Sequence, residues 1–228
     1  MDLLEAMDAR HSVRNYTDQR IEGAVLGELQ RAIAECNHEG DLNIQLCVNE
    51  PTAFSGMMAR YGKFNNVKNY IALIGKKNDK LDEKCGYYGE KLVLKAQQLG
   101  LNTCWVAVTF SKGKSKNAVN IQSGEKLLMV ISIGYGENSG IPHKSKSIEA
   151  LSKADGAIPN WFRSGMTAVK LAPTAMNQQK FLFSLTGNTV SASPGSGFYT
   201  KVDLGIAKYH LEIGAGDAQW KWANESAK

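Results

Sequence analysis

The run Leu127–Ile133 (LLMVISI) constrains the fold most, because it is almost wholly apolar and is followed by glycines at positions 134 and 136. A short, nearly continuous apolar run of this kind is typical of a buried strand. Tyr70–Ile74 (YIALI), which ends at Gly75, has the same character. Both runs are far shorter than the roughly 18–20 residues that a membrane-spanning helix needs. The sequence therefore predicts at least two buried strands.

Amphipathic segments surround these strands. Helical spacing of apolar residues predicts helices at Leu3–Met7, Ile21–Ala34, Leu81–Leu99, Ser147–Leu151, Trp161–Leu171 and Asp203–Ala215. Further strands are predicted at Asp41–Val48 and Lys180–Leu185, and the breaker-rich stretch Ser191–Gly197 predicts a loop. Helices and strands do not alternate strictly, and several strands are close enough in sequence to pair antiparallel. We therefore expect an α+β fold with a mixed or antiparallel sheet flanked by helices, rather than a doubly wound sheet.

Two glycine-bounded amphipathic segments, Gly89–Gly100 and Gly205–Gly216, have the same length, and a tryptophan follows each, at Trp105 and Trp220. Packed together, they would relate two halves of the chain, about residues 1–150 and 151–222, by an internal pseudo-two-fold axis. They are equally well explained as two unrelated helices with glycine caps. A chain of 228 residues suits one domain, or two small halves that share a core. We expect a single domain over residues 1–228 with two similar halves.

The composition is that of an ordinary globular protein, with 43% hydrophobic and 21% charged residues. The net charge of +5 is modest and the basic residues are dispersed, which disfavours nucleic-acid binding. The four cysteines and four histidines are scattered without metal-ligand spacing, so we expect no metal site and reduced thiols. The first residues lack the apolar block of a secretory signal. A soluble cytoplasmic protein with no membrane partner is the expectation.

One polar cluster, Arg10-His11-Ser12-Val13-Arg14, follows the first predicted helix. Guanidinium groups make bidentate, charge-assisted bonds to phosphate, and a serine hydroxyl adds a neutral donor. In an extended segment the side chains of Arg10, Ser12 and Arg14 point to one side. A solvated basic turn explains the same residues, and composition alone favours it.

Three further segments have residue types suited to a flat, phosphorylated ligand. Gly100–Ala107 leads from a helix end into an apolar extended stretch whose backbone N–H groups could face the polar edge of a ring. Ala172–Phe181 contains three consecutive amides, which both donate and accept hydrogen bonds. Lys144 and Lys146 could neutralise a phosphate from the opposite side. Each segment also has an ordinary explanation, as a helix-to-strand connection, a polar loop and surface lysines.

Taken together, these segments resemble the flavin-dependent nitroreductase family. RHSVRNY (10–16) is similar to the family's R-[RH]-S-x-R-x-[FY] motif. LVLKAQQLGLNTCWV (92–106) is similar to A-x-x-L-G-L-G-[TS]-C-W-[IV]. LAPTAMNQQKF (171–181) is similar to A-P-S-x-x-N-x-Q-P-W, with Lys180 and Phe181 in place of Pro-Trp. KSKSIEAL (144–151) resembles a basic, phosphate-facing stretch, so the resemblance spans roughly residues 1–220.

The resemblance implies a layered nitroreductase-like fold and an FMN site in which the flavin carries the chemistry, so that no side chain is assigned as catalytic. It places Arg10 and Ser12 at the phosphate, and Arg14 at the phosphate or at the pyrimidine edge of the ring. Backbone N–H groups near Val106 and Ala107 are implied to meet flavin N5 or O4. The residues implied to bind the cofactor are Arg10, His11, Ser12, Arg14, Thr103, Cys104, Trp105, Val106, Ala107, Lys144, Lys146, Pro173, Thr174, Ala175, Met176, Asn177 and Gln179.

The A-P-[ST]-x-x-N-x-Q motif is displaced in this chain. In typical members it follows the first long helix, where this sequence has Asn37–Asp41, and here it lies after residue 170. Typical members are intertwined homodimers whose flavin sites combine segments of both subunits. We therefore hypothesise that the second half of this chain replaces the partner subunit, as in a smaller, rearranged branch of the family. This predicts one FMN site per polypeptide in a monomer with an internal pseudo-dimer, with a homodimer as the alternative.

The resemblance further implies an oxidoreductase that passes electrons from NADH or NADPH, through FMN, to a nitroaromatic, a quinone or a similar small oxidised acceptor by a ping-pong mechanism. No G-x-G-x-x-G motif follows a predicted strand, which favours a shared stacking site over a separate NAD domain. A non-catalytic FMN-binding storage or sensor module is the alternative. A flavin-free structural protein is a third possibility.

Overall fold

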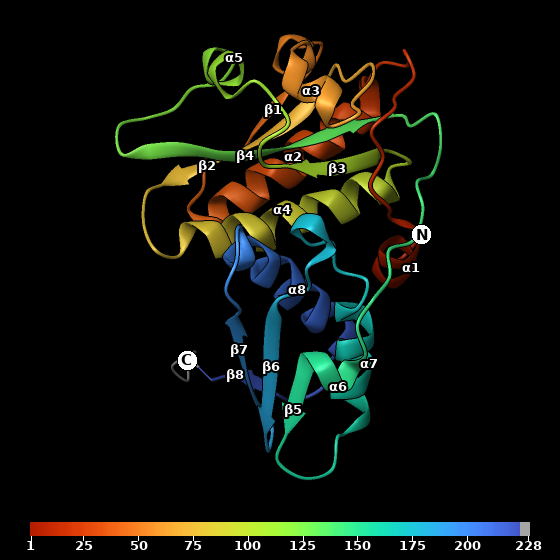
Figure 1. Cartoon of the computed structure of the whole chain (residues 1–228), viewed down its shortest axis with the longest axis vertical. Helices are drawn as coiled ribbons and strands as arrows, with labels where there is room; N and C mark the ends of the chain where they lie inside the picture. The colour runs from red at the N-terminus through yellow and green to blue at the C-terminus, as the bar shows by residue number, and fades with distance from the viewer. Residues whose placement is uncertain (224–228) are drawn as a thin grey trace.

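The computed structural model describes residues 1–223 and contains two four-stranded sheets, one above and one below a central layer of helices (Figure 1). The helices are α1 (Leu3–Ala9), α2 (Gly23–Gly40), α3 (Met57–Tyr61), α4 (Leu81–Gln98), α5 (Lys112–Asn117), α6 (Ile148–Leu151), α7 (Asn160–Val169) and α8 (Thr200–Ala215). The strands are β1 (Gln45–Cys47), β2 (Tyr70–Lys76), β3 (Asn102–Val106), β4 (Glu125–Gly134), β5 (Ser152–Ala154), β6 (Phe181–Thr186), β7 (Thr189–Pro194) and β8 (Lys221–Trp222). Short 3-10 turns lie at Thr52–Phe54 and Ala175–Asn177.

The first sheet has the strand order β1-β2-β4-β3 and is antiparallel throughout. Successive side chains of a strand point to opposite faces, and both faces of β2 are covered. Ile71 and Leu73 pack into the core that α2 and α4 share with the sheet. Tyr70, Ala72 and Ile74 pack into a second core on the other face. Burial on both faces explains why β2 and β4 read as continuous apolar runs, as predicted.

The second sheet has the order β5-β6-β7-β8 and mixes parallel with antiparallel pairs. Here the predicted loop at Ser191–Gly197 is wrong for its first four residues, which belong to β7. A tight turn at Gly187, whose φ is +59°, reverses the chain so that β7 pairs with β6 along its whole length. β8 pairs only with the start of β7. Within residues 1–223, no strand pairs with Pro194 on the β8 side, so its missing N–H costs no ladder hydrogen bond there.

One predicted strand starts later than expected, and one predicted helix has nearly the bounds that the sequence indicates. The strand expected at Asp41–Val48 is confined to β1, because α2 continues to Gly40 and Asp41 caps it in the left-handed conformation. The helix predicted at Leu81–Leu99 is present as α4, and Gly100 follows it with φ +78°. A left-handed residue after a helix, usually glycine, is the common way to end one.

The central contact of the molecule is the crossing of α4 and α8 (Figure 1). A Cβ atom at Gly86 would lie 2.1 Å from the carbonyl oxygen of Val202. A Cβ atom at Gly205 would lie 2.0 Å from the carbonyl oxygen of Glu83. The two backbones therefore touch, and only glycine fits at either position. The sequence left two explanations open for the glycine-bounded segments, and the helices that contain them do pack together, although the two sheets that they join differ in strand order and direction.

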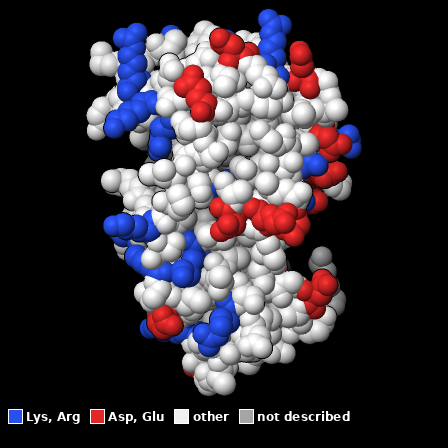
Figure 2. Space-filling model, turned by 90° about the vertical axis from the view of Figure 1, so that its right-hand side faces the viewer, with Lys and Arg blue, Asp and Glu red and all other residues white. Residues whose placement is uncertain are grey.

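The charged surface, the cysteines and the polarity of the helices are ordinary for a globular protein. On the face shown in Figure 2, groups of lysine and arginine side chains alternate with groups of acidic side chains. All four cysteines are buried and free. Within residues 1–223, the helices are all too short or too polar to cross a membrane.

The helix crossing generates a stability prediction. Gly205→Ala should lower the free energy of unfolding by about 1–3 kcal/mol, because the new methyl group forces the two backbones apart. Gly27→Ala is the matched control, since α2 has nothing within 4 Å of that Cβ position. It should raise stability by roughly 0.5–1 kcal/mol through the helix propensity of alanine. Thermal and denaturant unfolding followed by circular dichroism measures both, and equal stabilities for the two variants would contradict the close crossing.

Candidate functional site

The segment after α1 runs extended beside β3. Ser12 forms a bridge with Thr103, and the backbone N–H of Val13 donates to the Thr103 carbonyl oxygen at 3.0 Å. Val13 points into the core, which leaves Ser12 and Arg14 facing the opposite side, where both line a cavity. Arg10 does not share that side, contrary to the sequence prediction. It caps the end of α1 and is 3% exposed, with its guanidinium turned toward Glu90 of α4.

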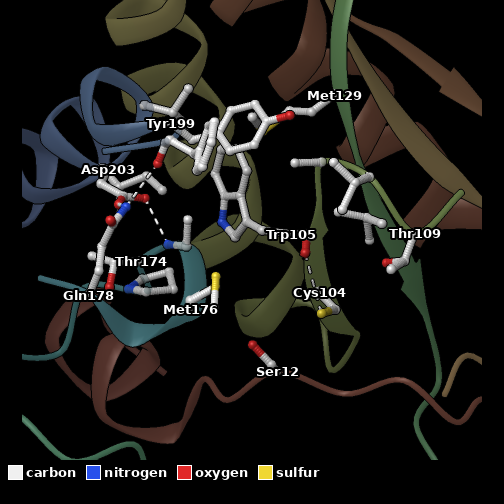
Figure 3. Close-up of a pocket in the computed structure, with 18 of the residues that line it drawn as sticks. Ser12, Cys104, Trp105, Thr109, Met129, Thr174, Met176, Gln178, Tyr199 and Asp203 are labelled. Carbon is white, nitrogen blue, oxygen red and sulfur yellow. Dashed lines mark hydrogen bonds between the residues drawn. The ribbon is translucent and has the colours of Figure 1, made fainter. Parts of the chain in front are cut away.

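The cavity has a volume of about 550 Å³ and lies between the two halves of the chain (Figure 3). One wall comes from the first half, namely from Ser12, Arg14, Cys104, Trp105, Val106, Ala107, Val108, Thr109 and Met129. The opposite wall comes from the second half, namely from Pro173, Thr174, Ala175, Met176, Gln178, Phe198, Tyr199, Val202, Asp203 and Ile206. Segments about 160 residues apart in sequence thus form one mostly apolar site, the usual character of a small-molecule pocket.

Trp105 gives the first wall its apolar surface. A Cβ atom at Gly89 would come within 2.4 Å of its ring, so the indole lies directly against α4 where that helix lacks a side chain. The indole N–H donates to the Glu90 carboxylate at 3.0 Å. Cys104 precedes it, and burial raises the pKa of its thiol, although Arg14 and Ser12 act in the other direction. That thiol is therefore a poor nucleophile.

Asp203 organises the second wall. Its carboxylate accepts hydrogen bonds from the backbone N–H of Ala175 at 2.9 Å and from the side-chain amide of Gln178 at 2.7 Å. Burial raises the pKa of Asp203 from its ordinary value of 3.8 to about 6, against the lowering effect of those two donors. The loop that it holds carries Met176 in the left-handed conformation, with φ 52° and a side chain that is 98% exposed beside the cavity.

Five predicted cofactor residues are not among the residues that line the larger cavity or a second, smaller one. Four of them connect two loops by hydrogen bonds, namely Lys144, Lys146, Asn177 and Gln179. Asn177 and the buried Gln179 both donate to the Lys144 carbonyl oxygen at 2.8 Å. Lys146 donates its ammonium to the carbonyl oxygens of residues 178 and 179, at 2.9 and 3.0 Å. Thr103 also lies outside the lining, inside the first sheet. An ammonium group with two carbonyl partners would have to leave them to reach a phosphate.

A smaller cavity of about 170 Å³ holds the remaining predicted cation. It is lined by Met7, Asp8, Arg10, His11, Pro142, His143, Ser145 and Leu171. The Arg10 Nε atom is buried without a hydrogen-bond partner. Burial lowers the pKa of His143, while its bond to the Lys170 carbonyl oxygen raises it. Because the Arg10 Nε atom faces the Glu90 carboxylate at 3.9 Å, a further anion would have to bind at the other N–H groups of the guanidinium.

Of the predicted cofactor residues, the larger cavity therefore gathers Ser12, Arg14, Cys104, Trp105, Val106, Ala107, Pro173, Thr174, Ala175 and Met176, and the smaller one gathers Arg10 and His11. Sequence reasoning missed Asp203, Phe198 and Tyr199 in the larger cavity. Asp203 had one available signal, a lone acid between the apolar residues Val202 and Leu204 of a predicted helix. Phe198 and Tyr199 follow a breaker-rich stretch and carry no motif.

Comparison with known proteins identifies the family. The family model described as "Putative TM nitroreductase" matches residues 2–215. This chain belongs to that nitroreductase family. The resemblance inferred from its motifs is therefore confirmed. None of the curated proteins compared with this chain matches it.

Solved structures confirm the α+β layered fold of this chain. A putative nitroreductase from Thermotoga maritima is 20% identical, with a TM-score of 0.62, and the match covers 92% of this chain and 82% of that one. A putative nitroreductase from Desulfovibrio desulfuricans, solved in complex with FMN, is 18% identical with a TM-score of 0.52, over 70% of this chain and 99% of that one. A nitroreductase family protein from Streptococcus pneumoniae is 15% identical with a TM-score of 0.52, over 66% and 98% of the two chains.

The environment of Asp203 predicts a pH dependence of stability. Because its folded pKa of about 6 exceeds the ordinary value of 3.8, the folded state binds the proton more tightly than the unfolded state. The stabilisation is complete below the unfolded pKa and is lost as the pH rises through the folded one. Relative to Asp203→Asn, the wild type should therefore lose roughly 1–3 kcal/mol of unfolding free energy between pH 4 and pH 7. Parallel urea-unfolding curves for the two proteins across this range would contradict the raised pKa.

Proposed function

We propose that this chain binds FMN in the larger cavity and uses it to pass electrons from NADH or NADPH to a small oxidised acceptor such as a nitroaromatic or a quinone. One observation carries the proposal. The arginine-containing segment at 10–14 and the loop at 173–178, which are far apart in sequence, meet across a single apolar cavity. Membership of the nitroreductase family supports the same conclusion. So does the fold shared with a nitroreductase solved in complex with FMN.

The residues present fit such a cofactor. A volume of about 550 Å³ with mostly apolar walls suits a flat ring system. Ser12 and Arg14 supply a hydroxyl and a cation at one wall, and Gln178 supplies an amide at the other. Arg10 lines the smaller cavity with its Nε paired to Glu90 at 3.9 Å, so an anion such as the terminal phosphate would bind through the other N–H groups of its guanidinium.

When bound, FMN would supply the hydride-transfer chemistry, and the protein would supply orientation and electrostatics. Trp105 would present an apolar wall to the ring. Backbone N–H groups near Val106 and Ala107 would donate to its polar edge, and the Arg14 guanidinium would stabilise negative charge there. Arg10 and His11 would hold the phosphate, with Lys144 as a further candidate cation. The protein is proposed to act in the cytoplasm.

Both walls of the cavity come from one polypeptide, which supports a complete site in each chain. We propose that the second half of the chain takes the place of a partner subunit, with α4 and α8 as the core of an internal pseudo-dimer. The expected stoichiometry is one FMN per chain in a monomer, measured by flavin absorbance together with light scattering. Two flavins per chain, or flavin binding only by a dimer, would contradict this arrangement.

Mixing flavin-loaded protein with NADH or with NADPH in the absence of oxygen tests the activity. The visible absorbance of the flavin should bleach within seconds and return on addition of a nitroaromatic or a quinone. A yellow protein that does not bleach would support the alternative of a storage or sensor module. A preparation that stays colourless after addition of FMN would overturn the proposal.

Substitution of the two arginines tests the site. Arg14→Ala and Arg10→Ala should each weaken FMN binding by about 10- to 100-fold, the value of a charge-assisted hydrogen bond. Arg31→Ala is the matched control, because Arg31 pairs with Glu28 on the surface of α2, remote from both cavities. Fluorescence titration of FMN measures the three affinities, and equal affinities would exclude both cavities as the flavin site.

A further inference from the structure

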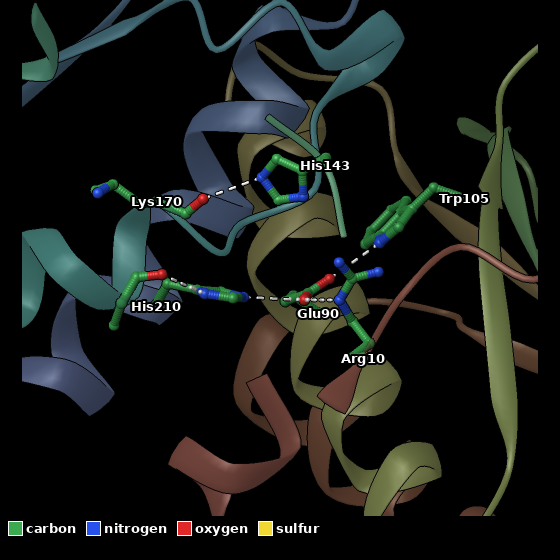
Figure 4. Close-up of polar contacts among 7 residues, drawn as sticks. Arg10, Glu90, Trp105, His143, Lys170 and His210 are labelled. Atoms are coloured by element: carbon green, nitrogen blue, oxygen red, sulfur yellow. Dashed lines mark hydrogen bonds and ion pairs between the residues drawn. The ribbon is translucent and has the colours of Figure 1, made fainter. Parts of the chain in front are cut away.

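Glu90 is a carboxylate in the interior of the protein, 0% exposed in the middle of α4. Removing such a group from water costs several kcal/mol unless it is paired and hydrogen-bonded. Three partners surround it (Figure 4). The Trp105 indole N–H donates to Oε2 at 3.0 Å, and His210 Nε2 lies 3.0 Å from Oε1. Arg10 Nε lies 3.9 Å from the same Oε1.

The hydrogen bonds of His210 determine which carboxylate oxygen of Glu90 accepts the hydrogen bond of the Trp105 indole. Nδ1 of His210 lies 2.9 Å from the carbonyl oxygen of Ala168, and a carbonyl can only accept, so Nδ1 donates. With the ring proton on Nδ1, both Nε2 and the carboxylate oxygen are acceptors. A hydrogen bond between them therefore requires one further proton, either on Nε2 or on Oε1. Oε1 is thereby committed to His210 on α8, and Oε2 is left to accept the hydrogen bond of the indole.

The partners of Glu90 belong to different walls of the candidate site. Trp105 lines the larger cavity and Arg10 lines the smaller one. His210 lies on α8, the helix that also contributes Val202 and Asp203 to the opposite wall. Glu90 therefore connects the N–H edge of the Trp105 indole, in the first half of the chain, to His210 on α8 in the second half.

We propose that Glu90 is a positioning residue, which fixes the Trp105 indole against α4 and thereby sets the shape of the cavity; its effect on FMN rests on the function proposed above. Gly89 leaves room for the ring but cannot orient it, since packing against a bare helix permits rotation. A directional hydrogen bond at the indole edge selects one orientation. Replacement of buried ion pairs by apolar residues is often neutral or stabilising. A role in stability alone would therefore not require a carboxylate here.

The position of the ring can be measured without a ligand. The chain has four tryptophans, and the indole resonance of Trp105 in a proton–nitrogen correlation spectrum is the one lost in Trp105→Phe. Glu90→Leu should shift that resonance and accelerate its exchange with water about tenfold, the effect of losing one buried hydrogen bond. Glu90→Gln retains an acceptor oxygen and should leave the resonance near its wild-type position.

FMN affinity supplies the second measurement, as a double-mutant cycle. Glu90→Leu should weaken FMN binding about tenfold in the wild-type background and less than about threefold in the Trp105→Phe background, where there is no indole N–H to position. Glu90→Gln should restore most of the affinity. The same fold-change in both backgrounds would overturn the positioning role, because a general loss of structure does not depend on the indole.

Glu212→Leu is the matched control. Trp222 donates its indole N–H to Glu212 at 2.8 Å, in the same kind of contact, and neither residue is among the described residues that line the larger or the smaller cavity. Glu212→Leu should shift the indole resonance of Trp222 and leave FMN affinity unchanged. Circular dichroism checks folding, and Glu90→Asp, which withdraws the carboxylate by one methylene, replaces Glu90→Leu if the latter does not fold.

The two proposals fail in different ways. A wild type that does not bind FMN would overturn the proposed function, while the indole measurement on the ligand-free protein would still decide whether Glu90 positions Trp105. An unmoved Trp105 resonance in Glu90→Leu would overturn the positioning role even if FMN binds.

Discussion

The direct contact between the backbones of α4 and α8 is the constraint on which the rest of the structure depends. α4 covers a face of the first sheet and α8 covers the second, so the distance between these helices fixes the distance between the two halves. Gly86 and Gly205 reduce that distance to the minimum that backbone atoms allow. Side chains at these positions would separate the halves and open the apolar cavity that lies between them.

The same contact explains why buried charges collect near the site. Helices that approach so closely leave little room for water, and polar side chains between them must find protein partners. Glu90 finds Trp105 and His210, and Asp203 finds the loop that follows Pro173. Each wall of the cavity is therefore held by a carboxylate from one of the crossing helices: Glu90 of α4 bonds Trp105 in the first wall, and Asp203 of α8 bonds the loop in the second.

Much of this arrangement is predictable from sequence, because apolar periodicity reports burial directly. The runs at Tyr70–Ile74 and Leu127–Ile133 became the central strands, and α4, α7 and α8 lie near their predicted bounds, whereas α2 continues to Gly40 beyond the predicted Ala34. The short helices α3 and α5 and the strand β7 were missed or misassigned. α3 and α5 are only five and six residues long, too short for a helical period to show in the sequence, and β7 consists mostly of small or polar residues that pair with β6. Arg10 was placed with Ser12 and Arg14 because periodicity in an extended segment cannot anticipate that it caps α1 beside a buried glutamate.

The displaced amide motif shows most clearly why the walls can come from one chain. The loop at 173–179 is bonded through Gln179 and Lys146 to the segment that follows β4. That segment is in turn anchored to the N-terminal stretch, where Tyr16 bridges Gly136 and Gly140 lies against His11. A continuous set of contacts within the chain therefore connects the second wall to the first. The motif lies after residue 170, in the second half of the chain, and the α4–α8 crossing holds that half against the cavity. In the proposed function, the second half thereby occupies the position of a partner subunit.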